Sequence, residues 1–137
     1  MIENTLGLMA AAWLTWFFLN FAMMVIVAIC VKPKQPSFNG FQICIPAWVL
    51  GVLDPEEVQA IIVHEQGHKA LWHVWENFLA TCFFVGPGDD RRRQQEIEAD
   101  DYAAELGHAR QLASALRKLS KSKCDLDRAE RLLRHYC

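Results

Sequence analysis

The sequence predicts a mainly α-helical protein with one N-terminal transmembrane helix and a small helical domain that carries a minimal edge strand or hairpin. Three observations support this fold class: an unbroken apolar stretch near the N-terminus, helical spacing of apolar residues through most of the remainder, and one short segment of β type. The chain of 137 residues has room for only one domain beside such a helix.

Residues 1–31 are expected to be an uncleaved membrane anchor. Their core, Leu6–Val31, is almost entirely apolar and, as a helix, is long enough to cross the roughly 30 Å hydrocarbon core of a bilayer with tilt. A cleaved signal peptide fits less well, because the only charge before the stretch is Glu3 and the stretch is too long. Lys32 and Lys34 follow directly, so the positive-inside rule predicts a single-pass protein with a cytoplasmic domain.

Composition and the anchor limit the partners to a lipid bilayer and other proteins. The net charge of −2 and the scattered basic residues argue against nucleic acid. The five cysteines are odd in number and lack paired spacing, which fits a reducing compartment. Asn20 and the small pair Gly7 and Ala11 would allow a homo-oligomer through the transmembrane helix, although such residues are also common without that role.

The anchor is followed by a short connector and then the domain. Residues 32–40 contain two prolines and predict a stiff, extended connector, after which the domain covers residues 41–137. The strand candidate is 41–45, which is closed off by Pro46. A helix start is predicted at Asp54, with Pro55 at the first helical position and a glutamate three residues beyond the cap.

The rest of the domain is predicted to be helical. Apolar residues keep the helical period from Pro55 to the break at 86–88, and the last part, 78–85, is expected to lie in the core rather than at the membrane. A further helix is expected to begin near Gln94 and to end at Gly107. Two short amphipathic helices are predicted at 109–119 and 127–136.

The first helix contains a candidate metal site. His64 and His68 stand four residues apart, so both imidazoles project from one helix face, and Glu65 lies beside them. Two histidines at this spacing suit a catalytic zinc ion, which needs a third protein ligand and leaves one position for water. Glu65 is placed to accept the proton of that water.

The next helix offers the missing ligand. Glu96 and Asp100 share one face, so Glu96 would complete a His, His, Glu set, and Asp100 could accept the free ring N–H of a ligand histidine. The alternative is a solvated acidic turn that suits the helix dipole and binds nothing.

Three segments resemble the zinc-dependent membrane peptidases of the HtpX and CAAX prenyl protease type, within the gluzincin clan: LDPEEVQAIIVHEQGHKALWH, EIEADDYAAELG and ARQLASALRKL. The resemblance covers residues 50–119 and implies a gluzincin-like zinc-peptidase domain. It implies the roles of five residues: zinc ligands His64, His68 and Glu96, general base Glu65, and Asp100 as the residue that orients a ligand. His73 receives no ligand role, and packing or a hydrogen bond within the helix is expected for it.

The chain also departs from that family, since it is shorter, has one membrane span, and has space for only one or two strands beside the cleft. The family supplies a residue that stabilises the oxyanion, and the sequence does not select among four candidates: Tyr102, His108, Arg110 and His135.

The sequence therefore predicts a membrane-anchored zinc metalloendopeptidase that hydrolyses membrane-associated or unfolded proteins, with substrates paired along the strand at 41–45. The alternative is an inactive membrane adaptor that keeps the scaffold. A latent form is a third hypothesis, in which Cys124, His135 or Cys137 of the C-terminal tail fills the open zinc position.

Overall fold

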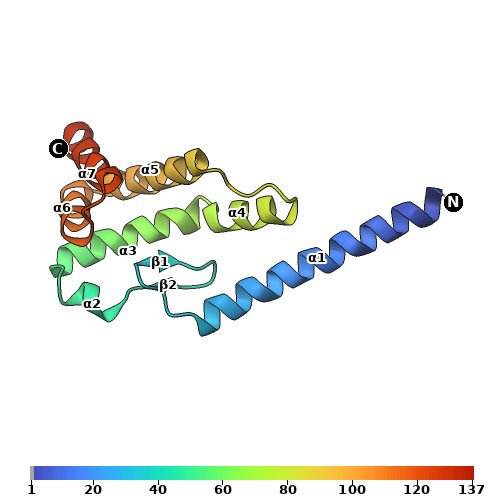
Figure 1. Cartoon of the computed structure of the whole chain (residues 1–137). Coiled ribbons are helices and arrows are strands. Elements are labelled where there is room, and N and C mark those ends of the chain that lie inside the picture. Colours follow the sequence, from blue (N-terminus) through green and yellow to red (C-terminus); the bar gives the residue numbers. More distant parts are fainter. Residues whose placement is uncertain (1) are drawn as a thin grey trace.

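The computed structural model describes the backbone of residues 2–137 and the side chains of residues 4–137. A long N-terminal helix leads into a helical domain with a two-stranded hairpin, which confirms the mainly helical prediction (Figure 1). The elements of this part of the chain are α1 (Ile2–Cys30), β1 (Ser37–Phe38), β2 (Ile43–Cys44), α2 (Ala47–Leu50), α3 (Pro55–Ala70), α4 (His73–Cys82), α5 (Asp89–Glu105), α6 (Ala109–Leu119) and α7 (Lys123–Tyr136).

α1, near the N-terminus, is long and apolar enough to cross a membrane. Its candidate span is Asn4–Cys30, with a mean hydropathy of 2.1. Most of its side chains are exposed, but one face contacts the domain. On this face Trp13 donates a hydrogen bond from Nε1 to the carbonyl oxygen of Cys82 (3.2 Å), and Asn39 donates from Nδ2 to the carbonyl oxygen of Ala28 (3.2 Å).

β1 and β2 form an antiparallel hairpin with Ser37 opposite Cys44. The carboxamide oxygen of Asn39 accepts hydrogen bonds from the backbone N–H groups of Phe41 and Gln42, which fixes the turn. The sequence assigned Ser37 to the connector 32–40 and placed the strand at 41–45. A two-residue strand shows no alternating pattern, so nothing in that segment distinguished it from a connector.

The core of the domain lies between α3, α5, α6 and α7. Leu112 of α6 and Leu132 of α7 are fully buried there. The predicted start of α3 is confirmed, because the carboxylate of Glu57 accepts a hydrogen bond from the backbone N–H of Asp54 at 2.9 Å. The predicted bounds of α6 and the stop at Gly107 are also confirmed, whereas α5 begins at Asp89 rather than near Gln94.

The single helix expected from Pro55 to residue 85 is wrong, because α3 ends at Ala70 and α4 begins at His73. Trp72 between them has a left-handed backbone (φ 61°), which bulky residues rarely adopt. In a continuous helix, residues five apart point about 140° away from each other. The break turns His73 back toward His68.

The expectation that residues 78–85 lie in the core is also wrong. Within this segment Cys82 is buried, but Phe83, Phe84 and Val85 are 60%, 71% and 66% exposed. The segment runs beside α1 instead of between the domain helices.

Glu57 provides a test of the fold. Its buried carboxylate accepts hydrogen bonds from Ser114 Oγ (2.6 Å) and Lys118 Nζ (2.7 Å). Burial alone would raise the pKa of Glu57, but these bonds and the one from Asp54 outweigh it and lower the pKa. A lowered pKa stabilises the fold above the ordinary pKa, and this stability is lost as the pH falls toward the folded value.

Glu57→Gln should therefore lower the free energy of unfolding by about 2 kcal/mol near neutral pH. The deficit should shrink as the pH falls below about 5. Thermal unfolding in detergent at a series of pH values measures this, with exposed Glu56→Gln as the control. A deficit that stays constant with pH would contradict the charge contribution.

Candidate metal centre

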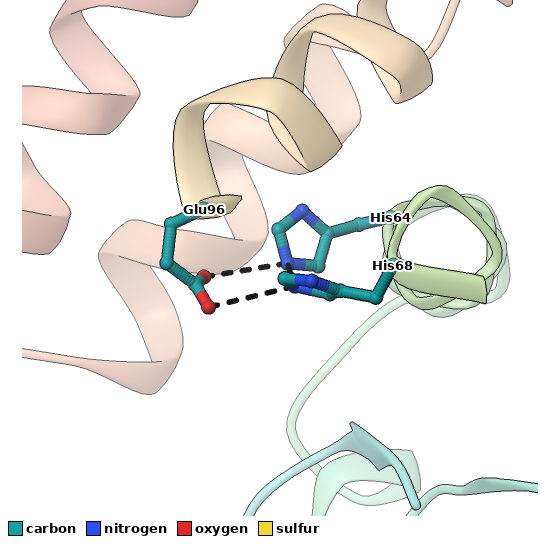
Figure 2. A group of neighbouring side chains, drawn as sticks. All are labelled: His64, His68 and Glu96. Atoms are coloured by element: carbon teal, nitrogen blue, oxygen red, sulfur yellow. Dashed lines mark hydrogen bonds and ion pairs between the residues drawn. The ribbon is translucent and has the colours of Figure 1, made fainter. Parts of the chain in front are cut away.

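The structure brings His64 and His68 of α3 together with Glu96 of α5 (Figure 2). The two imidazole Nε2 atoms are 3.3 Å apart. Oε2 of Glu96 lies 3.5 Å from Nε2 of His64, and its Oε1 lies 3.4 Å from Nε2 of His68. The three side chains that the sequence selects as ligands therefore converge on one point.

The distance between the two Nε2 atoms fits two ligands of one tetrahedral metal ion, and each Nε2 has a different oxygen of Glu96 at a similar distance. Zinc bonds of about 2.0–2.1 Å place tetrahedral ligand atoms about 3.3–3.5 Å from one another. Direct hydrogen bonds between such groups are shorter, at about 2.7–3.2 Å. The two imidazoles and one carboxylate could hold a metal ion, and a donor set of this kind suits zinc.

The contact between α3 and α5 sets this geometry. Gly67 packs against α5 so closely that an added Cβ would lie 3.1 Å from Cα of Ala99 and 3.2 Å from Cβ of Tyr102. Gly67 follows His64 by three residues, and Ala99 follows Glu96 by three residues. Each helix thus has a small residue on the face that carries its metal-binding side chain.

His64 is oriented by a buried ion pair. Its Nδ1 lies 3.0 Å from Oδ1 of Asp100, a charge contact that is not aligned as a hydrogen bond. Arg128 of α7 holds the same carboxylate with two hydrogen bonds, Nε to Oδ2 and Nη2 to Oδ1, both 2.8 Å. Burial alone would lower the pKa of His64, but Asp100 and Glu96 outweigh it and raise it to about 9. The carboxylates thus favour a positive charge at this ring. The sequence predicts that Asp100 accepts a hydrogen bond from a ring N–H of a histidine; the structure brings the two atoms together but does not align them as that bond.

His68 is oriented by a second chain of contacts. Its Nδ1 lies 2.9 Å from Nδ1 of His73, whose Nε2 lies 2.8 Å from Oε2 of Glu98. Because an ionised Glu98 only accepts, a neutral His73 donates from Nε2 and accepts at Nδ1. His68 then donates from Nδ1 and keeps a lone pair on Nε2, facing Glu96. Burial and the nearby charge on His64 lower the pKa of His68 to about 4, which favours this neutral form.

His73 is therefore more than the packing residue that the sequence suggested. It is 1% exposed, and its hydrogen bonds cross from α4 to α3 and α5 rather than staying within one helix. Arg91 is the last member of this series of contacts, since it forms ion pairs with both Glu98 (3.0 Å) and Glu76 (2.6 Å).

Glu65 is buried beside the ligands at 6% exposure. Burial raises its pKa, and the negative charge of Glu96 adds to the rise, whereas His64 and the backbone N–H of Phe38 reduce it. A carboxylate with a raised pKa is a better proton acceptor than a fully solvated one.

Two hollows meet at the candidate centre. A cavity of about 580 Å³ lies toward α6 and α7, and a second of about 320 Å³ lies toward β1 and α4. The two hollows share five of their lining residues: Pro36, His64, Glu65, Arg92 and Glu96. The strand beside the centre is β1, because Ser37 and Phe38 line the smaller hollow and residues 41–45 line neither, contrary to the expectation for the strand at 41–45.

The four oxyanion candidates do not line either hollow. Tyr102 packs behind Gly67, His108 directly precedes α6 as its N-cap, and Arg110 and His135 are exposed. Three arginines that the sequence did not single out do line them: Arg92 lines both hollows, whereas Arg93 and Arg128 line the larger one. A signal existed for Arg128, since it lies one turn from Leu132 on the buried face of an amphipathic helix, where a charge requires a partner.

The C-terminal tail forms part of the domain wall. α7 packs on α6 through Ala129 and Leu132, both fully buried. Of the three tail residues considered as a fourth ligand, Cys124 lines the larger hollow, whereas His135 and Cys137 are exposed and line neither.

Comparisons of the chain with protein-family models, curated proteins and solved structures give no significant match. The resemblance to the HtpX type of peptidase stays a prediction from the motifs.

Gly67 offers a direct test of the helix contact. Gly67→Ala should force α3 away from α5, lower the free energy of unfolding by about 1–3 kcal/mol, and weaken binding of Zn²⁺. Thermal unfolding and isothermal titration with Zn²⁺ measure both effects. Gly51→Ala is the control, because its added Cβ would meet nothing closer than 3.5 Å. Unchanged stability and zinc affinity in Gly67→Ala would contradict this role.

Proposed function

We propose that the protein is a membrane-anchored zinc metalloendopeptidase. The observation that carries the proposal is the cluster of His64, His68 and Glu96 at the meeting point of two open hollows, with one possible ligand atom from each residue, all within 4.8 Å of one another. A buried carboxylate, Glu65, lines the same two hollows. The resemblance of three sequence segments to HtpX-type and CAAX-type peptidases points to the same reaction.

A zinc ion bound by these three side chains would lower the pKa of a water ligand to about 7 and polarise a peptide carbonyl. Glu65 accepts the proton of the attacking water and then delivers it to the leaving amine. His73 and Asp100 hold the two imidazoles in place, so that neither ring must reorient during the reaction.

Arg92 is the stronger candidate for stabilising the developing oxyanion. It lines both hollows, and no ion pair engages its guanidinium within residues 4–137. Arg128, in contrast, is held by Asp100, Glu96 and Asp125, so we assign it a positioning role.

The substrate is an extended peptide of a membrane-associated or unfolded protein. β1 borders the smaller hollow, and Pro36, directly before it, borders both, so a chain laid along β1 would pass the centre. Lys32 and Lys34 favour a cytoplasmic domain by the positive-inside rule. Association of copies through α1 remains part of the proposal.

One observation favours the alternative, an inactive or latent membrane adaptor. Nη1 of Arg128 lies 3.0 Å from Oε2 of Glu96. Burial alone would raise the pKa of Glu96, but His64 and the charge of Arg128 outweigh it and lower the pKa to about 2. A cation this close to the third ligand competes with a metal ion for the same carboxylate.

The functional test compares the wild type with Glu65→Gln in detergent, measuring bound zinc and cleavage of an unfolded protein. The proposal expects zinc in both proteins and a loss of cleavage by a factor of at least about 100 in the variant, because the general base is removed. Zinc without cleavage in the wild type would favour the adaptor. A wild type that binds no zinc would refute the proposal.

A further inference from the structure

Four exposed apolar residues gather where α4 ends. Leu79, Phe83, Phe84 and Val85 are 48%, 60%, 71% and 66% exposed, and together we call them the hydrophobic tip. Aromatic and aliphatic side chains in one exposed cluster mark a surface that another apolar phase covers. The cluster also lies outside the metal centre, since none of its members lines the two hollows.

The tip lies beside the middle of α1. The rings of Phe83 and Trp13 are 5.5 Å apart, and those of Phe84 and Trp16 stack at 5.1 Å. Trp13 and Trp16 are near the centre of the span Asn4–Cys30, and Trp16 is about 20 Å along the helix from its C-terminal end. Figure 1 shows α4 at an angle to α1, with its C-terminal end and the following loop directed toward the middle of that helix. If α1 crosses a bilayer, the tip is at the depth of the hydrocarbon.

Four backbone groups at the tip and its base are hydrogen-bonded within the protein. Within the turn, the N–H groups of Phe83, Phe84 and Val85 donate to the carbonyl oxygens of Leu79 (3.1 Å), Thr81 (3.0 Å) and Ala80 (2.9 Å). The carbonyl oxygen of Cys82 accepts from the Trp13 indole. Non-helical backbone enters a membrane only when such groups are satisfied within the protein.

Charged residues mark where the apolar surface ends. Glu76 is the last charge before the tip and Asp89 the first after it, and Arg91 binds Glu76 at 2.6 Å. From Glu76 to Cys82, α4 advances about 9 Å. Residues 86–88 contain two glycines and a proline and return the chain to the charged start of α5.

We propose that the hydrophobic tip inserts as a re-entrant segment into the acyl chains of the leaflet nearer the domain, beside α1. The candidate metal centre would then lie at the level of the lipid headgroups. His73, which contacts His68, begins α4 about one turn before Glu76, on the side away from the tip. The acyl chains of a bilayer would cover the tip, since its exposed apolar side chains continue the apolar surface of α1. This inference concerns lipid contact and stands independently of any metal or catalysis.

The test places photoreactive p-benzoyl-phenylalanine in the full-length chain, reconstituted into phosphatidylcholine vesicles, at Phe84 and, in a second variant, at Val85. Both side chains are exposed, so the substitutions leave the core unchanged. After irradiation, mass spectrometry identifies the adducts. The control carries the same residue at Leu106, which is 56% exposed at the far end of α5.

The proposal expects lipid adducts at Phe84 and Val85 and their absence at Leu106. Crosslinks between two copies of the chain at Phe84 would show that a second copy covers the tip, and would overturn the proposal. Absence of any adduct at both tip positions would show a tip in water, with the same consequence. Equal lipid adducts at Leu106 would also overturn it, because the contact would not be specific to the tip.

Discussion

The close contact of α3 with α5 at Gly67 is the constraint on which the candidate centre depends. His64, Gly67 and His68 share one face of α3, and Glu96 and Ala99 share the opposing face of α5. The absent side chain lets the two backbones approach, and that approach brings the nitrogen and oxygen atoms to 3.3–3.5 Å. The same packing that completes the core thus also defines the size of the site.

Two chains of polar contacts then fix the rings, and each ends on an arginine. One runs from His64 through Asp100 to Arg128, and the other runs from His68 through His73 and Glu98 to Arg91. Burying charges is costly unless their partners are well aligned, and the two 2.8 Å bonds between Arg128 and Asp100 meet that condition. α7 and α4 therefore support the site even though neither supplies a ligand.

Local spacing was enough to predict that His64 and His68 lie together, because residues four apart on a helix meet on one face whatever the tertiary fold. That Glu96 meets them depends on the packing of α5 against α3. The contacts of His73 could not be predicted in this way, since they depend on the left-handed Trp72, a position without the usual glycine or asparagine signal. The oxyanion candidates were chosen by residue type alone, without knowledge of which helix faces the hollows. Residues 78–85 were assigned to the core because apolar periodicity does not distinguish a protein interior from a lipid-facing or solvent-exposed surface.

The hydrophobic tip and the candidate metal centre lie at opposite ends of α4, so the depth of the tip in a bilayer also sets the distance of the proposed zinc site from the membrane.

X-ray absorption of the zinc-loaded, full-length protein tests most directly whether the proposed side chains hold the ion. We expect a four-coordinate ion with nitrogen and oxygen neighbours at about 2.0–2.1 Å, two of them imidazoles, and no sulfur. A sulfur neighbour at about 2.3 Å, or a six-coordinate ion without imidazole, would contradict it.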